Sequence, residues 1–133
     1  MARPLATDGV VVIDGEVLVM ERTHDPYEGH WVLPGGFVER DERAREACVR
    51  EVREEVGLAV KVEEFVGLYD DPGRDERGTV SAAYRCRPVV EDPHPEPREE
   101  ARRVRTVGPG DLPPMGFDHA EIIRDTFEGI ETV

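Results

Sequence analysis

The sequence predicts an α/β protein in which helices cover a mixed β-sheet. Two observations lead to this fold class. Segments typical of strands outnumber those typical of helices, and the two predicted helices follow the first hairpin and close the series of elements. The 133 residues suffice for one domain with a buried core, and no repeat or linker divides them. We therefore predict a single domain over residues 1–133.

The first predicted element is a hairpin over residues 9–22. Two aliphatic runs meet there at Asp14-Gly15, a dipeptide that favours a tight turn. An irregular loop follows, in which Trp31 to Leu33 form a short extended piece.

The next element is a helix of four turns over residues 41–56. Asp41 is a suitable N-cap because its side chain can accept a hydrogen bond from the first turn. Gly57 is a suitable residue to end the helix, because glycine adopts the left-handed conformation found there.

Three further strands and a closing helix complete the fold. The strands are predicted over residues 59–69, 79–90 and 101–107. Turn-rich or proline-rich acidic segments separate them. The closing helix covers residues 117–130, with Ala120, Ile123 and Phe127 on one apolar stripe.

The composition limits the class of partner. A net charge of −13 argues against binding to a nucleic-acid backbone, which requires a basic face. Lys61 is the only lysine, and Asn and Gln are absent. An acidic, lysine-poor surface is typical of a protein kept soluble in concentrated salt. A GC-rich genome is the alternative, although it explains the missing lysine and not the excess of acids.

The chain contains two cysteines and no apolar run longer than a strand. Cys48 and Cys86 lie in apolar surroundings without a metal-binding spacing, so we predict reduced packing residues. No segment resembles a membrane span or a signal peptide. These features predict a cytoplasmic protein without a membrane partner.

Three glutamates of the 41–56 helix share the face that carries its small residues. At about 100° per residue, the positions within roughly 60° of Glu51 are Ala44, Ala47, Cys48, Glu54 and Glu55. The other side fits an exposed Glu46–Arg50 pair. Inward-facing carboxylates repel one another and lose solvation, so they need a counter-charge. Mg²⁺ or Mn²⁺ would supply it, because hard cations prefer carboxylate oxygen. A solvated charged face is the alternative for a generic helix.

The spacing of residues 36–58 resembles a known family motif. Gly36 is followed by five residues, Glu42, seven residues and then Arg50 to Leu58, "REVREEVGL". This resembles the Nudix box, GX5EX7REUXEEXGU with U aliphatic, at every fixed position. The preceding residues 31–39 also resemble the usual lead-in. The resemblance implies the Nudix fold, an α/β/α sandwich with a central mixed β-sheet.

The resemblance also implies roles for the residues of the box. Glu51 and Glu55 correspond to metal ligands, and Glu54 to a further ligand or the group that activates water. The carbonyl of Gly35 resembles a backbone ligand, and Arg50 the arginine that holds the carboxylates. Such a site fits in-line attack of water on a pyrophosphate, because bound Mg²⁺ or Mn²⁺ neutralises phosphate oxygens and lowers the pKa of water.

The clearest clue to a substrate is residues 67–84, "GLYDDPGRDERGTVSAAY". They resemble a segment of archaeal and bacterial ADP-ribose pyrophosphatases. Two departures are that Glu76 replaces a proline and that the histidine after Gly78 is missing. The resemblance implies hydrolysis of ADP-ribose to AMP and ribose 5-phosphate, with Arg74 and Arg77 binding the substrate. Pairing of these arginines with aspartates of their own loop is the alternative.

Residues outside the box supply further candidates. Glu100 falls where the related enzymes carry a loop glutamate that joins the metals or serves as general base. Glu96 and Glu99 are neighbouring residues that could take this role instead. The other alternative is a solvated acidic loop without a role in the site. Arg22, at the end of the hairpin, resembles a residue that contacts phosphate or ribose, although a surface arginine fits equally well.

Aromatic side chains and one histidine are further candidates. The candidates for stacking on adenine are Tyr27, Trp31, Phe37 and Phe117, although packing roles are favoured for each. His119 is predicted to be structural, capping the last helix or meeting a neighbouring loop.

Two other functions stay open at this stage. One is hydrolysis of a modified nucleoside triphosphate or a dinucleoside polyphosphate. The other is an ADP-ribose sensor that binds without cleaving, which would not need the intact glutamates of the box. The resemblance to ADP-ribose hydrolases further implies a homodimer that acts on a small-molecule nucleotide.

Overall fold

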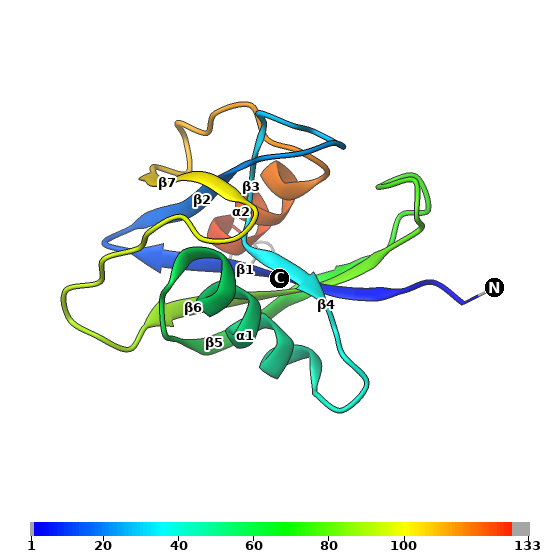
Figure 1. The fold of residues 1–133 in the computed structure, drawn as a ribbon, viewed down its shortest axis with the longest axis horizontal. Helices are drawn as coiled ribbons and strands as arrows, with labels where there is room; N and C mark the ends of the chain where they lie inside the picture. Colours follow the sequence, from blue (N-terminus) through cyan, green and yellow to red (C-terminus); the bar gives the residue numbers. More distant parts are fainter. Residues whose placement is uncertain (1, 129–133) are drawn as a thin grey trace.

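The computed structural model describes residues 2–128 and has the predicted α/β class (Figure 1). In chain order the elements are β1 Leu5–Ile13, β2 Glu16–Arg22, β3 Trp31–Val32, β4 Gly35–Phe37, α1 Ala44–Val56, β5 Val60–Tyr69, β6 Val80–Pro88, β7 Ala101–Val107 and α2 His119–Glu128. Figure 1 shows β1 running between the two helices.

The sheet is mixed, as predicted. Its main path has the order β3-β2-β1-β6-β5, while β4 pairs with β1 and β7 pairs with β2. The pair β1–β6 is parallel, and the other pairs are antiparallel.

Apolar cores cover both faces of the sheet. Alternate residues of a strand point to opposite faces, so neighbouring residues of β1 enter different cores. Val11 packs in a cluster with Val52 of α1, whereas Val10 packs in a second cluster with Ile122 of α2. The result is the α/β/α sandwich expected from the sequence.

The predicted hairpin is confirmed, but its first strand is longer than expected. Asp14 and Gly15 both have positive φ, 51° and 80°, as a two-residue turn between twisted strands requires. The strand β1 begins at Leu5 because its first half pairs with β6 and with β4. That half carries Thr7 and Asp8 to the centre of the molecule.

Helix α1 begins later than predicted and ends where predicted. The N-cap is Arg43 and not Asp41, and the backbone N–H of Arg43 donates to the Glu46 carboxylate at 2.7 Å. Glu46 therefore caps the helix instead of forming the expected pair with Arg50. Gly57 ends the helix with φ 70°, and its N–H donates to the Arg53 carbonyl at 3.0 Å.

The apolar stripe of helix α2 is the predicted one in part, because Ile123 and Phe127 pack on the core and Ala120 does not. The buried residues are His119, Ile122, Ile123 and Thr126, whereas Ala120 is exposed. Phe127 is partly buried against the core, and residues 129–130 of the predicted helix lie outside the described residues. Within residues 2–128, neither helix has the length and apolar character needed to cross a membrane.

The two cysteines face each other in the core between α1 and β6. Cys48 and Cys86 are free and fully buried, and their Sγ atoms are 3.8 Å apart. The hydrogen bond with the Cys86 thiol, together with burial, raises the pKa of Cys48 well above its ordinary value. Both thiols therefore act as the reduced packing residues that the sequence predicts.

Candidate active site

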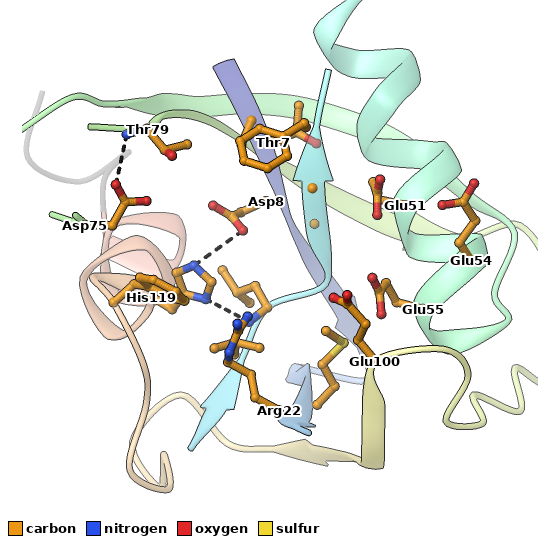
Figure 2. A pocket seen from close by; sticks show the side chains of 18 of the residues that line it. Thr7, Asp8, Arg22, Glu51, Glu54, Glu55, Asp75, Thr79, Glu100 and His119 are labelled. Atoms are coloured by element: carbon orange, nitrogen blue, oxygen red, sulfur yellow. Dashed lines mark hydrogen bonds and ion pairs between the residues drawn. The ribbon is translucent and has the colours of Figure 1, made fainter. Parts of the chain in front are cut away.

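A cavity of about 370 Å³ lies beside α1, β4 and the segments that precede β6, β7 and α2. Figure 2 shows charged side chains on two sides of it. We call one side the acidic wall, which consists of Glu51, Glu54, Glu55, Glu99 and Glu100. We call the other side the opposite wall, which consists of Asp8, Arg74, Asp75 and His119.

One arginine organises the glutamates of the Nudix-like segment. The guanidinium of Arg50 donates to both oxygens of Glu42, at 2.7 and 3.0 Å. It also donates to Glu51 at 2.9 Å, to Glu54 at 3.1 Å and to the carbonyl of Phe37 at 3.1 Å. These hydrogen bonds raise the pKa of Arg50 and lower that of Glu42. A rigid, planar group with five N–H donors therefore fixes three carboxylates at once.

Glu55 is a buried acid without a compensating charge. Its carboxylate is 4% exposed, and Oε2 has no hydrogen-bond partner among residues 2–128. Burial, together with the nearby carboxylates of Glu100, Glu51 and Glu99, raises the pKa of Glu55 to about 8. Burial also raises the pKa of Glu51, although the hydrogen bond from Arg50 opposes this shift.

Two glycines of β4 pack closely against their neighbours, Gly36 against Glu51 and Gly35 against β1. A Cβ atom on Gly36 would lie only 2.5 Å from Cδ of Glu51, and one on Gly35 only 2.1 Å from the carbonyl oxygen of Thr7. Any side chain at either position would force the backbone or the carboxylate to move. Glycine is therefore required where β4 passes the acidic wall.

The residues of the acidic wall fit a divalent cation. The unpartnered oxygen of Glu55 and the crowded carboxylates around it call for positive charge, and their chemistry is that of a hard-cation site. Within residues 2–128, no three acidic, histidine or cysteine side chains already converge as metal ligands. A cation would therefore draw the carboxylates together. The groups available to hold it are the carboxylates of Glu51, Glu54 and Glu55 and the carbonyl of Gly35.

The loop before β7 adds acids to the same wall. Glu99 and Glu100 both line the cavity, and Glu100 lies 3.9 Å from Nε2 of His24. Glu96 does not line the cavity, and its carboxylate accepts a hydrogen bond from Arg98 at 2.8 Å. Of the three loop glutamates considered from the sequence, the structure brings Glu99 and Glu100 to the site.

Arg74 lies in the opposite wall, but its guanidinium is already engaged. It donates to the two oxygens of Asp118 at 2.6 and 2.8 Å and to the carbonyl of Thr79 at 3.2 Å. Its side chain is 4% exposed. The sequence predicted that Arg74 binds the substrate or pairs with an aspartate of its own loop. The observed partner is Asp118, which lies 44 residues away in the chain.

Arg22 and Arg77 are the other arginines of the cavity. Arg22 donates through Nε to the carbonyl of Pro26 at 2.7 Å, and burial lowers its pKa. Arg77 is 55% exposed and lies 5.1 Å from the ring centroid of Phe37. Its contact with Asp75 is long, at 3.4 Å.

The aromatic candidates divide into packing residues and residues near the cavity. Trp31 is buried under the guanidinium groups of Arg103 and Arg105 and does not line the cavity. Phe117 lines the cavity and packs against Tyr27, with ring centroids 4.7 Å apart. Both also line an adjoining pocket of about 660 Å³.

A buried polar network supports the opposite wall (Figure 2). The N–H of Leu33 donates to Nδ1 of His119 at 2.9 Å, and Nε2 of His119 lies 3.4 Å from Asp8. The hydroxyl of Ser81 donates to the other oxygen of Asp8 at 2.5 Å. Burial lowers the pKa of His119. His119 meets a neighbouring loop, as expected, whereas Asp8 was missed although it is the only acid inside the first strand.

The fold and the site together define a hydrolase of the α/β/α sandwich class. Residues 3–126 match the family model described as NUDIX domain, so the chain belongs to the Nudix family. It is a Nudix pyrophosphohydrolase.

Three known proteins illustrate the similarity. An ADP-ribose pyrophosphatase of Methanocaldococcus jannaschii is 37% identical over 121 residues, which are 91% of this chain and 71% of that protein. A Nudix hydrolase of Nitrosomonas europaea superposes with a TM-score of 0.84 at 26% identity, over 98% of this chain and 74% of that one. A bifunctional NMN adenylyltransferase/ADP-ribose pyrophosphatase of Francisella tularensis, solved with AMP and a manganese ion, gives 0.84 at 25% identity, over 99% of this chain and 42% of that one.

Proposed function

We propose that this chain hydrolyses ADP-ribose to AMP and ribose 5-phosphate and that it depends on Mg²⁺ or Mn²⁺. The observation that carries the proposal is Glu55, a buried acid whose Oε2 has no hydrogen-bond partner among the described residues and which lies in a wall of further carboxylates. A cation would stabilise such a wall, and a cation there would bind the pyrophosphate oxygens.

The similar proteins support this choice of substrate and metal. The Methanocaldococcus jannaschii relative is named for the hydrolysis of ADP-ribose. The Francisella tularensis protein carries the same activity in its name and was solved with AMP, which would be one of the two products here, and with manganese.

The chain's own residues divide the work of the reaction. Bound cations would neutralise the pyrophosphate and lower the pKa of the attacking water. Arg50 orients Glu51 and Glu54 by hydrogen bonds. A carboxylate of the acidic wall, Glu54 or Glu100, takes a proton from the water. At the same time the oxygen of the water bonds to one phosphorus. The phosphorus–oxygen bond of the bridging oxygen then breaks, and the electron pair leaves with the second phosphate.

The opposite end of the cavity suits the remainder of the substrate. Arg77 is free to pair with a phosphate, and Arg22 lies beside the ring of Phe117, 5.3 Å from its centroid. Phe117 and Tyr27 present apolar ring surface for a base or a ribose.

A triphosphate or a dinucleoside polyphosphate is the second candidate substrate. One observation favours it: Arg74, which the ADP-ribose reading assigns to the substrate, is engaged by Asp118. A sensor that does not cleave is disfavoured, because the unpartnered acids reduce stability and only a metal-dependent reaction needs them.

The test is an assay of the purified protein with Mg²⁺ at low and at molar salt. The substrates are ADP-ribose, NADH, diadenosine polyphosphates and 8-oxo-dGTP. We expect release of AMP from ADP-ribose, lost in Glu54→Gln and retained in Glu121→Gln, which removes an exposed carboxylate on α2. Preferred cleavage of a triphosphate would replace the substrate assignment, and binding of ADP-ribose without cleavage would indicate a sensor.

The proposal extends to the state of the protein in the cell. We infer a single domain over residues 1–133, a homodimer, a cytoplasmic location and a surface adapted to concentrated salt. The net charge of −13 and the single lysine support the last point. Sedimentation at low and at molar salt would measure both the assembly and its salt dependence, and a monomer at both would reject the dimer.

A further inference from the structure

We propose that Asp118 and His119, adjacent residues where α2 begins, position two different loops of the active site. Asp118 sets residues 70–79, which we call the substrate loop, and His119 sets residues 33–36, which we call the glycine loop. The inference rests on the proposed metal-dependent hydrolysis, because it assigns each loop one part of that reaction.

The contact of Asp118 with the substrate loop is bidentate. Both oxygens of Asp118 accept hydrogen bonds from Arg74, at 2.6 and 2.8 Å, and the side chains are 17% and 4% exposed. Two parallel charge-assisted hydrogen bonds fix direction as well as distance. Because the pair is largely buried, loss of either partner would leave an uncompensated charge.

Arg74 passes this constraint to both ends of the substrate loop. Its own backbone N–H donates to the carbonyl of Asp71 at 3.0 Å, and its Nη1 donates to the carbonyl of Thr79 at 3.2 Å. The N–H of Thr79 donates in turn to Asp75 at 2.9 Å. Asp75 and Arg77, which line the cavity, therefore stand on a loop that Asp118 holds in place.

The contact of His119 with the glycine loop is a single buried hydrogen bond. Nδ1 accepts from the N–H of Leu33 at 2.9 Å, so in the neutral ring Nε2 carries the hydrogen and faces Asp8 at 3.4 Å. Figure 2 shows the ring of His119 facing Asp8. Gly35 follows two residues after Leu33 and is packed against the backbone of Thr7 without room for a side chain.

The two contacts therefore act on different parts of the reaction. The glycine loop supplies the Gly35 carbonyl, which is the backbone group available to a cation. The substrate loop supplies Arg77, which is available to the nucleotide. Asp118 and His119 act through their hydrogen bonds to these loops, so we assign them as positioning residues, and each should affect one loop.

The experiment compares Asp118→Asn and His119→Ala with a matched control, Asp125→Asn. Asp125 also lies on α2 and accepts a hydrogen bond across the fold, from the Tyr69 hydroxyl at 2.8 Å, but it does not line the cavity. Three quantities are measured: the Mn²⁺ dissociation constant without nucleotide, followed by electron paramagnetic resonance of free Mn²⁺, and kcat and KM for ADP-ribose.

We expect a split between the variants. Asp118→Asn should raise KM about tenfold, the usual effect of losing a charged hydrogen bond, and leave Mn²⁺ binding unchanged. His119→Ala should weaken Mn²⁺ binding about tenfold, as loss of an outer-shell partner does, and lower kcat while KM stays close to the wild-type value. His119→Asn should restore both values, because its Oδ1 can accept from Leu33. Asp125→Asn should change none of the three.

Other results would overturn the inference. If Asp118→Asn and His119→Ala both changed KM and Mn²⁺ binding to the same extent, α2 would have only a general structural role. The same conclusion would follow if Asp125→Asn changed these two quantities as well. If Asp118→Asn does not fold, Arg74→Lys replaces it, because a lysine loses the bidentate contact. A wild-type protein that does not cleave ADP-ribose rejects the proposed substrate instead. In that case the Mn²⁺ titration still tests His119. KM is then measured with whichever nucleotide of the assay panel the wild-type protein cleaves.

Discussion

The two walls of the cavity treat the same kind of side chain in opposite ways. On the acidic wall, Glu55 is buried, carries an oxygen without a partner among the described residues, and has its pKa raised to about 8. On the opposite side, Asp8 receives a hydrogen bond from Ser81 and faces His119, and Asp118 receives two hydrogen bonds from Arg74. Both walls are acidic, but only one is satisfied by the protein itself.

The difference indicates what each wall is for. A buried acid that is paired within the protein fixes geometry, because removing its partner would be costly. A buried acid left unpaired reduces the stability of the fold and is retained where a ligand completes it. We therefore expect the acidic wall to hold a cation and the opposite wall to be the frame that holds the loops around it.

The largest effect is expected from Glu55→Gln, which removes the unpaired charge. Activity should fall by more than about a hundredfold, because a residue that binds the cation directly is lost. This loss exceeds the usual effect of removing an outer-shell partner. Mn²⁺ affinity should fall with it. Activity close to that of the wild type in steady-state assays would mean that Glu55 holds no metal.

The same substitution should stabilise the metal-free fold at high pH. The pKa of Glu55 is about 8 in the fold and 4.5 in its ordinary state, so the unfolded chain releases this proton first as the pH rises. The penalty on the fold begins near pH 4.5, grows until about pH 8 and is constant above it. The melting temperature of Glu55→Gln should be several degrees higher than that of the wild type at pH 9. At pH 4 the two melting temperatures should be equal. The control is Glu54→Gln, which alters a more exposed carboxylate, and its melting temperature should rise less.

A smaller effect is expected when the geometry of the acidic wall is loosened and its charge is kept. Arg50→Lys retains the positive charge but cannot contact Glu42, Glu51 and Glu54 at once. We expect kcat to fall about 10–100-fold, as for other outer-shell partners, with little change in KM. Arg53→Lys, at an exposed position of the same helix, should leave kcat unchanged. Equal rates for both variants would show that Arg50 has no orienting role.

The sequence predicts those parts of the fold that depend on neighbouring residues. The Asp14-Gly15 turn and the Gly57 helix end were predicted correctly because each needs only local backbone conformation. The start of β1 at Leu5 was missed, since it depends on pairing with β6, a strand about 75 residues further along the chain. The N-cap was misplaced because Glu46 accepts from the backbone N–H of Arg43, so the helix is capped two residues later than Asp41.

The same division applies to the candidate site. Glu51, Glu54 and Glu55 stand on one helix, so their spacing alone places them together. The pair of Arg74 and Asp118 joins residues that lie 44 positions apart, and the sequence shows no periodicity that connects them. The acidic wall could therefore be predicted, whereas the frame of the opposite wall could be seen only in the structure.

The smallest effect on activity is expected from Ser81→Ala, which removes one partner from the opposite wall. Asp8 would lose the hydroxyl that donates to it at 2.5 Å and keep only the contact with His119. The free energy of unfolding should fall by about 2 kcal/mol, the usual effect of leaving a buried acceptor unpaired. The rate should change less than about twofold, because Asp8 and Ser81 support the frame without touching the cation. Urea unfolding and steady-state kinetics on the same preparation would measure both. A large loss of rate without a loss of stability would place Asp8 in the reaction itself and remove the distinction between the two walls.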